Sequence, residues 1–304
     1  MRLLGTAAGG GFPQWNCRCT NCRDSRENPK EAEPRLQSGI AVSADGDRWF
    51  LVNASPDIRF QVEAFPPLRG NGNTGRGSAI EAVLLTNGDL DHTLGLVLLR
   101  EGEKIRACSS ISVRSDLERG LGLISLLDSY CGIEWLEPPQ TLAPLPLRGG
   151  GPSGLLYRAF SVPGKPPRYS EAVRLPAPDD CIGYRVEDAA TGGTLVCIPD
   201  IAALDERTTA EIAQCDLLLI DGTFWSDNEM EEVCPGGRSA ASMGHATIGG
   251  ELGTLKALKH LRETQVVYVH INNTNPILRA HSPERAELQA CGIECGFDGM
   301  QFVL

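Results

Sequence analysis

The chain has 304 residues, enough for one large domain or two ordinary ones, and a formal net charge of −11. This acidity disfavours nucleic acid and anionic membrane surfaces as partners. No apolar run approaches the roughly 20 residues of a membrane helix, and the apolar stretch at the N-terminus is too short for a signal peptide. We therefore expect a cytoplasmic protein.

Short runs rich in Val, Ile and Leu, bounded by Gly, Asn, Asp or Pro, predict β-strands along the whole chain. The predicted strands cover residues 2–7, 39–43, 49–53, 82–85, 111–114, 156–162, 182–187, 194–198, 217–220, 266–271 and 293–304.

Helices are predicted between some of these strands. Asp205 is a suitable N-cap for a helix over 206–215, and Ser282 followed by proline predicts a helix that ends near Gly292. Leucines at helical spacing predict a helix over 248–261. We expect one domain spanning 1–304, with inserted loops near 137–154 and 163–178.

Three of the eleven cysteines, Cys17, Cys19 and Cys22, form a C-x-C-x-x-C motif in an N-terminal loop covering about residues 9–25. An odd number of cysteines without an export signal argues against a disulfide framework. Three thiolates this close together predict a structural Zn²⁺ site, with a redox pair as the alternative. The candidates for a fourth ligand are His245, His281, Cys234 and a residue near Asn273.

A second candidate site follows the apolar run at 82–85. The segment from Thr86 to Gly95 resembles the metallo-β-lactamase signature T-H-x-H-x-D-H-x-x-G, but Asn87 and Asp89 stand where its first two histidines would be. Asp91 and His92 match the signature. In the alternative interpretation, Asp89 and Asp91 only cap the helix that follows.

The histidine supply limits the chemistry of this second site. Of the five histidines, His260 and His281 are expected to be exposed, whereas His270 follows a predicted buried strand. His245 is a further candidate that could bind metal, orient a ligand or cap a helix that it begins. At most three imidazoles are therefore available, too few for the usual dinuclear zinc hydrolase.

The sequence instead predicts a single metal bound by His92, His270 and a carboxylate from Asp91 or Asp89. In the favoured assignment this carboxylate is Asp91. Asp89 and Asp200, the latter placed after a predicted strand, are expected as further ligands or as acceptors for the ligating imidazoles. Two histidines and one carboxylate with open positions suit Fe²⁺ and oxygen chemistry.

Several blocks of the sequence together resemble the pyrroloquinoline quinone (PQQ) biosynthesis protein B family. They cover residues 9–19, 53–59, 91–96, 270–278 and 282–286. The resemblance implies an α/β metallo-β-lactamase fold, an αββα sandwich of two packed sheets flanked by helices. It also implies iron-dependent hydroxylation of a tyrosine in the peptide precursor of PQQ, with an external reductant and with other proteins of the pathway as candidate partners.

Two further implications of the resemblance remain open. The family has also been interpreted as a carrier of PQQ or its precursor toward the periplasm, and a metal-dependent hydrolase is a third possibility. An acidic quinone would need a basic pocket, for which Lys165, Arg168 and Arg174 are candidates. A related phosphodiesterase places its fourth zinc ligand, a histidine, at the position of Asn273.

Overall fold

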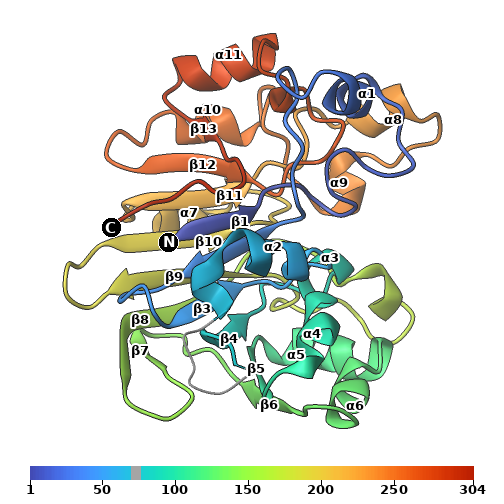
Figure 1. Ribbon diagram of the computed structural model, residues 1–304. Helices are drawn as coiled ribbons and strands as arrows, with labels where there is room; N and C mark the ends of the chain where they lie inside the picture. The colour runs from blue at the N-terminus through green and yellow to red at the C-terminus, as the bar shows by residue number, and fades with distance from the viewer. Residues whose placement is uncertain (70–76) are drawn as a thin grey trace.

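Two mixed β-sheets packed face to face form the centre of the computed structural model, which describes residues 1–69 and 77–304 (Figure 1). The first sheet has six strands in chain order, antiparallel from β1 to β3 and parallel from β3 to β6. Its strands are β1 (Arg2–Gly5), β2 (Gly39–Val42), β3 (Trp49–Val52), β4 (Ile80–Leu84), β5 (Ile105–Cys108) and β6 (Ile133–Leu136).

The second sheet has seven strands in the order β13-β12-β11-β10-β9-β8-β7. The strands from β13 to β10 are parallel, and those from β10 to β7 are antiparallel. Its strands are β7 (Ala143–Pro146), β8 (Pro152–Ser161), β9 (Ile182–Asp188), β10 (Thr194–Ile198), β11 (Leu217–Asp221), β12 (Gln265–Val269) and β13 (Glu294–Cys295).

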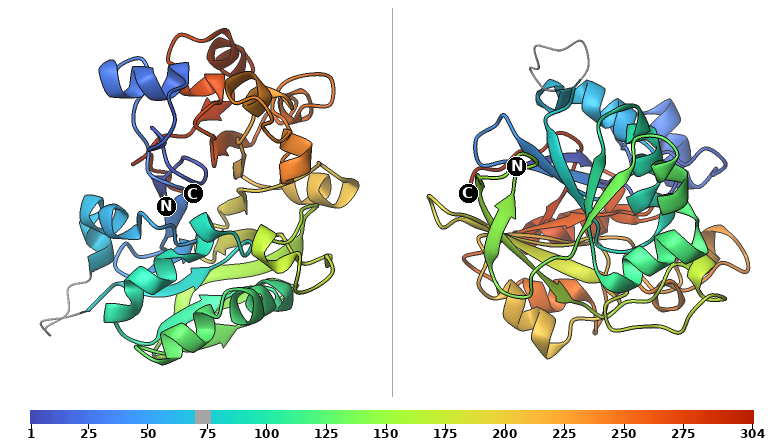
Figure 2. Two further views of the ribbon diagram at one scale, coloured as in Figure 1. Left: turned by 90° about the vertical axis from the view of Figure 1, so that its right-hand side faces the viewer. Right: turned by 90° about the horizontal axis from the view of Figure 1, so that it is seen from below.

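Helices cover the outer face of each sheet (Figures 1 and 2). The α-helices are α1 (Thr20–Glu27), α2 (Ile58–Ala64), α3 (Leu90–Thr93), α4 (Gly95–Leu98), α5 (Ile111–Ser115), α6 (Leu123–Asp128), α7 (Glu206–Ile212), α8 (Glu229–Val233), α9 (Ala240–Met243), α10 (Thr254–Leu258) and α11 (Pro283–Ala290). Single turns of other helix types cover Pro66–Arg69, Leu99–Glu101, Asp116–Gly120, Arg168–Ser170 and Pro276–Leu278. The predicted αββα metallo-β-lactamase fold is confirmed.

Central strands such as β10 are almost entirely apolar because both of their faces are buried. Leu195 and Cys197 lie in the core between the two sheets, whereas Val196 and Ile198 pack against the outer helices. The core between the sheets draws on residues from Leu3 to Phe302, and it is on this ground that we propose a single domain.

One predicted strand is a helix in the structure. Residues 111–114 lie in α5, and the hydroxyl of Ser110 accepts a hydrogen bond from the backbone N–H of Val113. An N-cap of this kind favours a helix even when β-branched residues follow it.

Two predicted elements are shorter than expected because glycines interrupt them. Only Thr254–Leu258 of the predicted helix over 248–261 is helical, after Gly250 and Gly253. Gly250 has a φ of +87°, which a helix does not allow. The last predicted strand is reduced to Glu294–Cys295, followed by Gly296 and Gly299.

The two predicted inserted loops differ in the structure. The first, 137–154, contains β7 and the start of β8, which pair with each other. The second, 163–178, contains only the single turn Arg168–Ser170. Among the helices described, none combines the length and the apolar character needed to cross a membrane.

Candidate functional site

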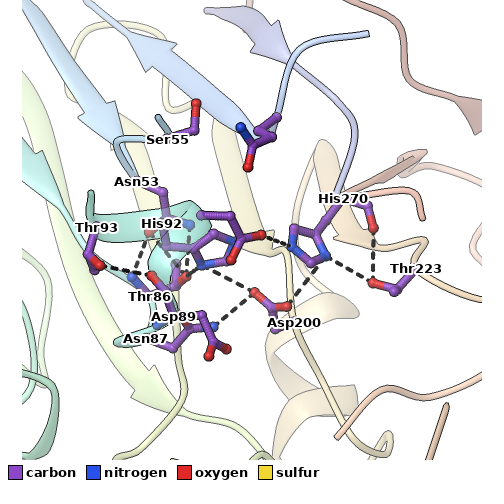
Figure 3. Close-up of polar contacts among 12 residues, drawn as sticks. Asn53, Ser55, Thr86, Asn87, Asp89, His92, Thr93, Asp200, Thr223 and His270 are labelled. Atoms are coloured by element: carbon purple, nitrogen blue, oxygen red, sulfur yellow. Dashed lines mark hydrogen bonds and ion pairs between the residues drawn. The ribbon is translucent and has the colours of Figure 1, made fainter. Parts of the chain in front are cut away.

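The carboxyl ends of parallel strands from both sheets meet at one edge of the sandwich, where open α/β sheets place their binding sites. β4 leads to α3, which carries Asp91 and His92. On the other sheet, Asp200 follows β10 and His270 follows β12. The fold thus brings together residues that are up to 179 positions apart (Figure 3).

Three potential ligand atoms face one another here. Asp91 Oδ2 lies 3.0 Å from His270 Nε2 and 3.9 Å from His92 Nε2. His92 is fully buried, and within the described residues its Nε2 atom has no hydrogen-bond partner. A buried nitrogen without a partner costs free energy, which a bound metal ion would offset. Burial also lowers the pKa of His92, which favours the neutral, ligating imidazole.

Asp200 lies behind this cluster and contacts both imidazoles. Its two carboxylate oxygens each lie 3.4 Å from a ring nitrogen, the Nδ1 of His92 and the Nδ1 of His270. The side-chain amide of Asn87 donates a hydrogen bond to Asp200 Oδ2 at 3.0 Å. Asn87, which replaces a histidine of the signature, therefore holds Asp200 in place, and Asp200 in turn orients His92 and His270.

Two hydroxyl groups fix the same ring nitrogens. Thr86 Oγ1 lies 3.3 Å from His92 Nδ1, and Thr223 Oγ1 lies 2.9 Å from His270 Nδ1. Two residues beside these hydroxyl groups have a positive φ, 55° for His270 and 62° for Asn53. Non-glycine residues at positive φ are uncommon and cluster at functional sites.

The structure also brings His245 into the cluster. Its Nδ1 lies 2.8 Å from Asp221 Oδ2, and its ring stacks on that of His270 with centroids 5.7 Å apart. Asp200, His245 and His270 form a second group with metal-ligand spacing that shares His270 with the first. The prediction that His245 begins a helix is wrong, because it follows α9 after Gly244, which ends that helix with a φ of +87°.

Asp89 lies beside the cluster but outside both three-residue groups. It precedes α3, yet its carboxylate makes no capping hydrogen bond, so the capping interpretation fails for this residue. Burial, reinforced by the charges of Asp91 and Asp200, raises the pKa of Asp89 to about 7.

The three cysteines converge at the N-terminus of α1. The Sγ atoms of Cys17, Cys19 and Cys22 lie within 4.8 Å of one another, and Cys22 is buried. The side-chain amide of Asn273 lies 3.2, 3.8 and 3.4 Å from these three sulfur atoms in that order. Its nitrogen and oxygen exchange places by a simple flip of the amide.

The other candidates for a fourth ligand lie elsewhere. His245 belongs to the Asp/His cluster, which comprises Asp91, His92, Asp200, His245 and His270. Cys234 is exposed, and the side chain of His281 is 86% exposed. Asn273, by contrast, contacts all three sulfur atoms through its side-chain amide. As expected, His260 is exposed.

The structure divides the three cations expected to form a basic pocket. Arg174 is paired with Asp116 at 2.6 Å and with Asp180 at 2.5 Å, so its charge is already neutralised. Arg168 is exposed, and Lys165 alone packs near the Asp/His cluster. Arg174 is therefore not available for the predicted basic pocket.

Comparisons with known proteins agree with the fold and the motifs. Residues 48–271 match a family model described as a β-lactamase superfamily domain. A diphosphatase of the PhnP family has a TM-score of 0.66 at 18% identity, over 98% of this chain and 94% of that one, and thus shares the fold.

Relatives match over the whole length. The coenzyme PQQ synthesis proteins B of Ectopseudomonas mendocina and Methylococcus capsulatus are each 42% identical to this chain, over 100% of it and 99% of their own length. The crystal structure of Zn²⁺-bound PqqB from Methylobacterium extorquens has a TM-score of 0.88 at 37% identity, over 100% of this chain and 99% of that one. The chain therefore belongs to the coenzyme PQQ synthesis protein B family, within the β-lactamase superfamily.

Proposed function

We propose that this protein takes part in PQQ biosynthesis as an Fe²⁺-dependent enzyme that hydroxylates the tyrosine ring of the peptide precursor. The observation that carries the proposal is the buried Nε2 atom of His92, which has no hydrogen-bond partner among the described residues and faces Asp91 and His270. Two imidazoles and one carboxylate are the donor set typical of non-haem iron oxygenases. The names of the relatives support the pathway.

Asp91, His92 and His270 would hold the ion, which supplies oxygen activation when bound. Asp200 contacts the Nδ1 atoms of both imidazoles and helps to fix their orientation, as outer partners of ligating histidines do. Asp89 remains free to accept a hydrogen bond from the substrate. One oxygen atom of O₂ enters the ring C–H bond, and the other leaves as water with two electrons and two protons from an external reductant.

The test is oxygen incorporation. Protein loaded anaerobically with Fe²⁺ is mixed with reductant, O₂ and a tyrosine-bearing precursor, and the product mass is followed. We expect a gain of one oxygen atom from labelled O₂, absent in His270→Ala and retained in His260→Ala, which alters an exposed histidine. No gain at full iron occupancy would refute the proposal.

Hydrolysis is the second candidate, favoured by the second group of Asp200, His245 and His270. Two ions would then share His270 through its two ring nitrogens, but its Nδ1 already lies against Thr223 and Asp200. Metal analysis that finds two ions in the Asp/His cluster would support the hydrolase. Carriage of PQQ would be supported by quinone binding without turnover.

We further propose that Cys17, Cys19 and Cys22 bind a structural Zn²⁺ with Asn273 as the fourth ligand, through its amide oxygen. The distances from the amide to the three sulfur atoms support this assignment. A site with four protein ligands has no open position, so its role is to hold the N-terminal loop against the segment after β12.

A further inference from the structure

Two cations converge on one backbone oxygen near the Asp/His cluster. Lys165 Nζ and a guanidinium nitrogen of Arg238 both donate hydrogen bonds to the carbonyl oxygen of Ser242, at 2.8 and 2.6 Å. Lys165 comes from the loop after β8, and Arg238 from the segment between α8 and α9. Their positive charges are therefore close neighbours, although like charges repel.

Neither cation forms an ion pair within the described residues. In the parts of the chain that the structure covers, 1–69 and 77–304, no carboxylate comes within ion-pair distance of Lys165 or Arg238. Arg174 on the same loop is paired with two aspartates. An adjacent pair of cations without an ion-pair partner in these parts of the chain is an arrangement that a carboxylate would complete.

The pair is held beside the Asp/His cluster. The stem of Lys165 lies across Gly244, where a Cβ atom would come within 3.0–3.2 Å of three of its carbon atoms. Gly244 is followed directly by His245, whose ring stacks on His270. Burial and the charge of Arg238 lower the pKa of Lys165, while the charges of Asp89 and Glu171 oppose this.

We propose that Lys165 and Arg238 form a carboxylate-binding subsite for an acidic group of the molecule bound at the Asp/His cluster. This inference rests on the proposed function, because the proposed substrate is a precursor of PQQ, which is an acidic quinone. The two donors offer charge-assisted hydrogen bonds, and the carbonyl oxygen of Ser242 keeps them together before the ligand arrives.

The test compares a charged acid with its uncharged ester. Binding of PQQ, which carries several carboxylates, and of its methyl ester is measured by calorimetry on the metal-containing protein. We expect the wild type to prefer the acid. Lys165→Gln and Arg238→Gln should each weaken acid binding about tenfold or more and leave ester binding unchanged.

Two variants serve as controls. Arg168→Gln removes a charge from the same loop outside the pair and should bind as the wild type, whereas Lys165→Arg keeps the charge and should retain acid binding. All variants should keep the wild-type metal content and Tm. A wild type that binds neither probe or both equally, or glutamine variants that bind the acid normally, would overturn the subsite. Oxygen incorporation is not part of this readout, so failure of the hydroxylase proposal would be seen separately.

Discussion

The cysteine cluster and the Asp/His cluster are built in opposite ways. The three cysteines come from one short segment that leads into α1 and face the side chain of Asn273, so we propose that their coordination is closed. Asp91 and His92 lie in α3, after a strand of the first sheet, and His270 follows a strand of the second; we propose that an ion held by these three residues keeps an open position. Thiolate donors in a closed shell suit structural zinc, whereas a carboxylate and two imidazoles with an open position suit catalysis.

The largest expected effect separates the two clusters by removing a ligand from the open one. Asp91→Ala and His270→Ala should lower iron affinity by more than about a hundredfold, beyond the usual effect of losing an outer hydrogen-bond partner. Zinc content should not change. Elemental analysis of both metals checks this, and simultaneous loss of zinc would contradict the independence of the clusters.

The converse change breaks the closed cluster. Cys22 is fully buried, and Cys22→Ser should release zinc and lower the Tm by more than about 10 °C, because metal binding contributes directly to folding. Cys234→Ser, which alters an exposed thiol, is the matched control. Equal Tm values for the two variants would show that the cluster holds no structural metal.

A smaller effect is expected from the residue that orients the open cluster. Asp200→Asn keeps the size of the side chain but weakens its contacts with the two Nδ1 atoms. Iron affinity should fall about 10–100-fold, with zinc retained. An affinity loss as large as that of His270→Ala would instead identify Asp200 as a direct ligand.

Asn273 tests the closed cluster more gently. Asn273→Ala should accelerate zinc loss to a chelator about tenfold, and Asn273→His should slow it, because imidazole is a stronger zinc ligand than an amide. Release rates in the presence of a colorimetric chelator measure both. If the two variants behave alike, the side chain at this position does not contact the metal.

The smallest effect concerns folding away from both clusters. Burial raises the pKa of Asp298, which accepts hydrogen bonds from Thr6 and Leu36, to about 6. The folded chain then binds a proton more tightly than the unfolded chain, so the free energy of unfolding should fall by about 1–3 kcal/mol as pH rises from about 4 to about 6. The free energy of unfolding, measured by denaturant titration at several pH values, should depend less on pH in Asp298→Asn. An unchanged pH dependence would exclude this group.

The sequence predicts the parts of the fold that depend on local pattern. Strands such as β10 and β12 are recognisable because both faces are buried, and the capping residues Asp205 and Ser282 start helices as predicted. β5 was missed because its four residues include Arg106. The helix at Ile111 was missed because an N-cap outweighs strand propensity there.

The site could be predicted only in part, for a physical reason. Asp91, His92 and His270 stand out because they lie in the segments that follow buried strands, where open α/β sheets place their binding sites. The contact of Thr223 with His270 and the convergence of Arg238 with Lys165 depend on how distant loops pack, which no local pattern encodes. Asp221 is the last residue of a buried strand, and this position indicates a polar role of the kind that its contact with His245 shows.

The central claim is that the two clusters hold different metals with different lability. The most direct test is elemental analysis of Fe²⁺-loaded protein before and after brief treatment with a chelator. We predict one resistant zinc and one removable iron per chain, with iron absent from His270→Ala. Two removable ions in the Asp/His cluster, or iron that persists in His270→Ala, would contradict this account.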